Sequence, residues 1–155
     1  MSFESARAWL AEHAPDIAII DQGASTATVA EAAEALGVEP ARIAKTLALR
    51  VGETVLLVVA RGDARLDNAK SKAEFGGRPR MLDPEETLAL TGHAVGGVCP
   101  FGLATALPVY CDVSLREFAT VFPAAGSRTS SVEVAPERLA ELVSQRWVDA
   151  CKLPG

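Results

Sequence analysis

Apolar residues at the start of the chain follow the spacing of an amphipathic helix. Phe3, Ala6, Trp9 and Leu10 recur three or four residues apart, so we predict a helix over residues 2–13. A short β-prone run follows at residues 17–20. After residue 43 the pattern changes to longer apolar runs, which are typical of strands.

Local start and stop signals predict where helices begin and end. Thr28 and Glu31 have the spacing of a capping box, and Gly37 is placed to end the helix that they open. Asp83 before a proline predicts another helix, which Gly92 breaks. The same reasoning predicts helices over 68–75 and 136–143 and a further capping box at 114–117.

Two apolar runs, 44–51 and 54–60, flank Gly52-Glu53 and predict a β-hairpin. Further strands are expected at 107–113, 121–122, 131–134 and around Trp147. The elements alternate without a regular βαβ repeat, and no repeat or low-complexity linker divides the chain. We therefore expect residues 1–155 to form a single α+β domain with a mixed sheet and surrounding helices.

The charge is unevenly distributed along the chain. The net charge is −5, yet residues 42–80 hold nine Lys or Arg and four Asp or Glu. Such a window is compatible with a basic face for phosphates and equally with a solvated surface segment. The chain has no apolar run long enough for a membrane span and no basic amino-terminal region, so we expect a cytoplasmic protein without a membrane partner.

Cysteine and histidine are too sparse for a disulfide framework or a zinc site. Three cysteines are widely spaced, and only two histidines could add nitrogen ligands. We expect no metal and no cofactor.

Residues 92–102 (GHAVGGVCPFG) are the first candidate for chemistry. Four glycines and a proline allow a loop whose N–H groups converge on a carbonyl oxygen or an oxyanion. A tight turn between core strands is the plain alternative. Cys99 with His93 as base would make a thiol hydrolase, although a cysteine beside a proline is more often a small buried hydrophobe.

Lys45 is the second candidate, because it stands at the start of an apolar run. Its stem can pack on the core while the ammonium reaches a phosphate or a carbonyl oxygen, or it can simply extend to solvent. Residues 125–131 place hydroxyl side chains around Arg128, which suits a polar pocket wall or an exposed turn. The basic residues that follow Asp67 could meet a polynucleotide backbone or only solvent.

Together these segments resemble the YbaK/EbsC family, which is similar to the editing domain inserted in bacterial prolyl-tRNA synthetases. The resemblance runs in order from about residue 25 to 143. Its motifs are residues 28–33, 43–47, 65–68, 92–102 and 133–136, of which the lysine strand followed by the glycine loop is the most specific. The family implies a curved mixed sheet and a free-standing aminoacyl-tRNA deacylase that uses no metal.

The resemblance also implies roles for individual residues. Lys45 would hold the tRNA 3′ end or the acyl carbonyl, and main-chain groups of the loop would surround the ester while a ribose hydroxyl of the substrate assists the attacking water. The catalytic positions are then Lys45, Gly96, Gly97 and Gly102. Substrate-binding positions are Thr28, Thr46, Val98, Cys99, Pro100, Phe101, Arg128 and Ser131, and Arg65, Lys70 and Lys72 would meet the tRNA backbone.

The chain departs from the branch that removes cysteine from prolyl-tRNA. It has Ala124-Ala125-Gly126 where that branch tends to have Ser-Ala-Gly, and Ser131 near the place of an acid. These differences leave open which amino acid is removed, and alanine, serine and threonine are the candidates. The sequence also leaves the oligomeric state open. A non-catalytic module that binds tRNA or a synthetase partner is the alternative, followed by the Cys99-dependent hydrolase.

Overall fold

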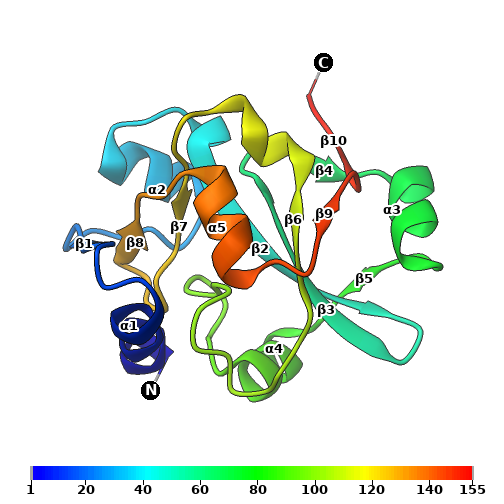
Figure 1. Ribbon diagram of the computed structural model, residues 1–155, viewed down its shortest axis with the longest axis horizontal. Coiled ribbons are helices and arrows are strands. Elements are labelled where there is room, and N and C mark those ends of the chain that lie inside the picture. Colours follow the sequence, from blue (N-terminus) through cyan, green and yellow to red (C-terminus); the bar gives the residue numbers. More distant parts are fainter. Residues whose placement is uncertain (1, 155) are drawn as a thin grey trace.

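The computed structural model describes residues 2–154, and it confirms an α+β fold built on a mixed sheet (Figure 1). A hairpin of β2 (Ile43–Val51) and β3 (Thr54–Arg61) forms its centre, with Lys45 opposite Ala60. The strand order is β5-β2-β3-β6-β9, and β7 also pairs with β2. The other strands of this sheet are β5 (Arg80–Met81), β6 (Val109–Asp112), β7 (Phe122–Pro123) and β9 (Trp147–Val148).

Both directions of pairing occur in this sheet. β3 is antiparallel to β2, whereas β6 runs parallel to β3 and β9 runs parallel to β6. Residues 56–60 of β3 are almost completely buried, as expected for a strand covered on both faces. Two small antiparallel sheets flank it: β1 (Ile19–Asp21) with β8 (Ser130–Val132), and β4 (Arg65–Leu66) with β10 (Cys151–Lys152).

Within residues 2–154 five α-helices surround the sheet, and the ends of two of them lie at the predicted caps. Thr28 and Gly37 bound α2, and Asp83 and Gly92 bound α4. The helices are α1 (Ser2–His13), α2 (Val29–Leu36), α3 (Asn68–Phe75), α4 (Pro84–Thr91) and α5 (Pro136–Val143), with 3₁₀ turns η1 (Pro40–Arg42) and η2 (Val113–Glu117). In the described part of the chain, no helix has the length and apolar character needed to cross a membrane.

One predicted helix start was wrong. Ser114 does not open an α-helix; instead Asp112 caps the short η2, and its Oδ2 accepts from the Ser114 N–H at 3.0 Å. Its Oδ1 accepts from the Ala150 N–H at 2.8 Å, so one carboxylate ties η2 to the segment before β10. The local pattern could not reveal this second partner, which lies 38 residues away.

Candidate functional site

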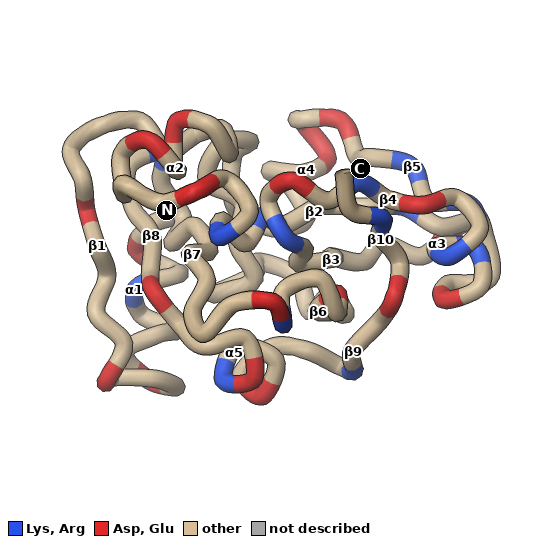
Figure 2. The backbone as a smooth tube through the Cα atoms, turned by 90° about the horizontal axis from the view of Figure 1, so that it is seen from above, with Lys and Arg blue, Asp and Glu red and all other residues tan. Residues whose placement is uncertain are grey.

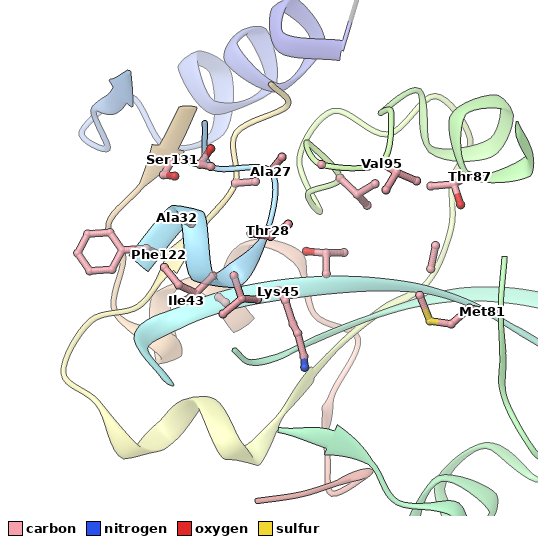
Figure 3. Close-up of a pocket in the computed structure, with 18 of the residues that line it drawn as sticks. Ala27, Thr28, Ala32, Ile43, Lys45, Met81, Thr87, Val95, Phe122 and Ser131 are labelled. Atoms are coloured by element: carbon pink, nitrogen blue, oxygen red, sulfur yellow. The ribbon is translucent and has the colours of Figure 1, made fainter. Parts of the chain in front are cut away.

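A cavity of about 230 Å³ opens between the start of α2, one face of β2 and the glycine loop (Figure 3). Residues 26–29, the β2 residues 43–46 and 48, and loop residues 95, 96 and 98 supply most of its wall. The remaining lining residues are Ala32, Met81, Leu82, Thr87, Phe122, Ala124 and Ser131. The cavity therefore joins segments that are far apart in the sequence.

Thr28 reaches the cavity because it caps α2. Its Oγ1 accepts from the Glu31 N–H at 3.1 Å, which confirms Thr28 as the helix cap, and it donates to Glu31 Oε1 at 3.2 Å instead of leaving that carboxylate to the Thr28 N–H. This hydroxyl already has partners within its own helix turn. Any contact that Thr28 makes with a ligand would have to share them.

Lys45 and Thr46 are neighbours on β2, and their side chains leave opposite faces of the strand. The Lys45 stem extends away from Thr28 and Val95, and its Nζ donates to the Ala64 carbonyl (Figure 3). Partial burial lowers the pKa of Lys45, and the positive charge of Arg65 adds to this effect. The ammonium thus lies beside the turn before β4, on the far side of β2 from the loop.

Only part of the glycine loop faces the cavity. Gly96 has φ +99°, and a Cβ there would lie 3.1 Å from Ala27 Cβ and from Arg128 Nε. The Gly97 N–H is used within the loop, donating to Ala94 O at 2.9 Å. Arg128 Nη2 donates to Val95 O at 3.2 Å, so this arginine holds the loop from outside the cavity.

The second half of the loop turns into the core. Gly102, at φ +62°, packs directly on the α1 backbone, where a Cβ would lie 2.5 Å from the Ser5 carbonyl carbon. Cys99 and Phe101 are 0% and 1% exposed. Cys99, Pro100, Phe101 and Gly102 do not line the cavity, because apolar side chains and a close helix contact direct this part of the loop into the core.

Cys99 and His93 touch, but they do not form a nucleophile and base. Burial raises the pKa of the Cys99 thiol to about 12 and lowers the pKa of His93. His93 Nε2 lies 2.7 Å from Phe101 O, and since a carbonyl only accepts, that nitrogen carries the proton. The thiol at 3.5 Å faces the same protonated nitrogen, which therefore cannot accept a proton from it.

The structure brings together only some of the predicted site residues. Thr28, Lys45, Thr46, Gly96, Val98 and Ser131 line the cavity; Gly97, Cys99, Pro100, Phe101, Gly102 and Arg128 do not. Sequence reasoning missed Thr26 and Ala27, although both stand directly before the predicted helix cap. It also missed Met81 and Thr87, for which no motif gives a signal.

Lys and Arg positions of α3, β4, β5 and β10 lie toward the same end of the molecule (Figure 2). Strand pairing sets Lys152 opposite Arg65, and both are exposed. Other cations of the basic window have carboxylate partners: Arg50 with Glu86, Arg61 with Asp63, and Lys70 with Asp149 at 3.2 Å. For Arg50 and Arg61 the solvated-surface interpretation is sufficient.

Within residues 2–154 no group of three or more His, Cys, Asp or Glu side chains is placed to hold a metal ion. The cavity offers a ligand main-chain groups, hydroxyl groups and the aliphatic stem of Lys45.

Comparison with known proteins agrees with this arrangement. The Aminoacyl-tRNA editing domain family matches residues 24–142, and the chain belongs to this family, the YbaK/EbsC family. The chain is 49% identical over 154 residues to the "Uncharacterized protein YwhH" of Bacillus subtilis, covering 98% of each chain. It is 33% identical to the "Putative Cys-tRNA(Pro)/Cys-tRNA(Cys) deacylase EbsC" of Enterococcus faecalis, covering 76% of this chain and 73% of the relative.

The fold has a close structural counterpart. A solved structure described as "a putative trans-editing enzyme for prolyl tRNA synthetase" superposes with a TM-score of 0.88 at 33% identity, covering 97% of each chain. The matched region of the family begins after α1 and β1 and ends before β9 and β10, so these four elements lie outside it.

Proposed function

We propose that this protein is an aminoacyl-tRNA deacylase that hydrolyses, in trans, the ester between a wrongly attached amino acid and its tRNA. The observation that carries the proposal is the cavity: it lies between β2 and the glycine loop, inside the region that matches the editing family. The relatives named for Cys-tRNA deacylation and trans-editing support the same reaction class. Residues 1–155 would then act as one editing domain.

In the proposed reaction the aminoacyl group enters the cavity and the terminal ribose stays at its mouth. A water molecule, assisted by a ribose hydroxyl, adds to the carbonyl carbon. The ester C–O bond then breaks, and the ribose oxygen leaves with a proton, giving free amino acid and uncharged tRNA. Main-chain N–H groups at Gly96 and Val98 would hold the developing oxyanion, because Gly97 already uses its own.

Of the two roles open to Lys45, holding the tRNA 3′ end suits its position better than holding the carbonyl. Its ammonium lies across β2 from the loop and beside the turn that leads to Arg65. Lys45 would bind a phosphate of the tRNA 3′ end beside this turn, with Arg65, Lys70 and Lys72 continuing the contact along the backbone. Lys152 joins this set through its pairing with Arg65.

A non-catalytic tRNA-binding module would use the same cavity without turnover. The test is to follow ester loss from a panel of mischarged tRNAs with wild type, Lys45→Ala and Cys99→Ala. We expect hydrolysis of at least one member, a loss in Lys45→Ala and near-normal rates in Cys99→Ala. Binding without hydrolysis of any member would favour the module, and loss in Cys99→Ala alone would favour a thiol mechanism.

A further inference from the structure

With one exception, the polar side chains that line the cavity are of one kind. They are the hydroxyls of Thr26, Thr28, Thr46, Thr87 and Ser131, together with Lys45. Within residues 2–154 the lining of this cavity includes no carboxylate, carboxamide or imidazole. Between the hydroxyls the wall is made of small apolar side chains, namely the alanines at 27, 32, 44, 48 and 124. Among the described residues, the cavity offers a charged side chain no carboxylate partner, and the one cation in its lining, Lys45, directs its ammonium to Ala64 O.

The four threonines divide into two pairs. Thr28 and Thr87 have partners within their own helices: Thr28 caps α2, and Thr87 Oγ1 donates to Asp83 O at 2.8 Å. Thr26 and Thr46 differ, because the Oγ1 of each is buried without a hydrogen-bond partner within residues 2–154. Thr26 is held rigidly, since its N–H donates to Arg128 O at 2.5 Å and the residue is 6% exposed.

A buried hydroxyl without a partner is costly, and most buried polar groups in folded proteins are paired. Two such groups in the wall of one cavity indicate that a ligand completes them. One staggered step about the Cα–Cβ bond can move the hydroxyl of a threonine into the position that its methyl group occupied, so either group can face the cavity. A hydroxyl can both donate and accept, and its best partner is another group that does both.

We propose that Thr26 and Thr46 make the acyl cavity selective for an amino acid whose side chain carries a hydroxyl, namely serine or threonine. This inference rests on the proposed deacylase function. Alanine and valine fit by size but leave both hydroxyls unpaired. Cysteine offers only a thiol, which is a weak donor and a weak acceptor.

The test compares pairs of esters on one tRNA body: threonyl with valyl, which have the same shape, and seryl with alanyl. For wild type we expect kcat/KM at least about tenfold higher for the hydroxyl member of each pair. Thr26→Val and Thr46→Val should each reduce that ratio, and the double variant should bring it close to one. Thr87→Val is the matched control, because its hydroxyl is already used within α4, and it should keep the wild-type ratio.

The outcomes separate this inference from the function on which it rests. Hydrolysis of alanyl and valyl esters as fast as seryl and threonyl esters by wild type would overturn the selectivity and leave the deacylase intact. Equal loss on all four esters in the valine variants, with an unchanged ratio, would also overturn it, since the threonines would then bind the common α-amino group. No hydrolysis of any mischarged tRNA would refute the deacylase itself. The wild-type ratios decide the matter even if a variant fails to fold.

Discussion

Replacing Gly102 with alanine tests whether the loop is held by the α1 backbone. The matched substitution is Gly37→Ala, because both glycines have a similar positive φ, +62° and +70°. A non-glycine residue in this conformation costs about 1–2 kcal/mol in either place. A Cβ at Gly37 meets nothing within 4 Å, whereas at Gly102 it would lie 2.5 Å from Ser5 C and 2.9 Å from Ala6 N.

Those neighbours of Gly102 are main-chain atoms of a helix, so they cannot rotate aside as a side chain would. Overpacking of this kind adds about 1–3 kcal/mol, so the total for Gly102→Ala is about 2–5 kcal/mol against about 1–2 kcal/mol for Gly37→Ala. In a chain of this length the mid-range losses in Tm are about 10 °C and about 4 °C.

Urea unfolding followed by circular dichroism measures the two free energies, and deacylation is assayed on the folded fraction. We expect Gly102→Ala to lower activity as well, because relief of the overlap displaces the loop that forms the cavity wall. Equal destabilisation by the two substitutions would refute the packing argument. Full activity in Gly102→Ala despite the larger loss would refute the link between α1 and the site.

Three further predictions concern the thiol, the imidazole and the basic edge. Cys99→Ala should keep deacylation within about threefold of wild type while lowering the free energy of unfolding by about 1–2 kcal/mol, because a buried sulfur is lost; abolished turnover in the folded variant would contradict this. Burial lowers the pKa of His93 below 6.5, so the unfolded chain binds more protons below that pH and stability falls on acidification. His93→Asn should lose this part of the pH dependence of stability, as measured by urea midpoints between pH 8 and pH 5. An unchanged pH profile would show that another titrating group causes the loss of stability. Lys152→Gln should weaken tRNA binding and reduce the slope of log K against log salt by about one. Arg138→Gln, on α5, should leave both the affinity and the slope unchanged, and equal effects of the two substitutions would argue against a specific basic edge.

Helix ends could be predicted from the sequence because the signals are local. Thr28 with Gly37 and Asp83 with Gly92 each mark an end by their own side chain or lack of one, and the structure confirms all four. Strand partners could not be predicted in the same way. β4, β5 and β10 have two residues each, too few for a period, so the pairing of Lys152 with Arg65 depends on tertiary contacts alone.

The candidate site was partly predictable for a related reason. The composition of the loop at 92–102 made it a candidate, but composition does not say which of its residues face the cavity. Gly96 and Val98 do, while Cys99 and Phe101 are drawn into the core by their apolar side chains. Thr26 was missed because a lone threonine before a helix cap carries no signal until its hydroxyl is seen to lack a partner.

The contact between α1 and the loop has a consequence for motion. Gly102 lies on the backbone of Ser5, and the rings of Trp9 and Phe101 are 5.6 Å apart, so we expect the loop to open only when α1 undocks. α1 precedes the part of the chain that matches the editing family. We therefore predict that the helix and the loop open as one cooperative unit. In native-state hydrogen exchange their amides should share a single opening free energy, set by an element that itself contributes nothing to the cavity wall.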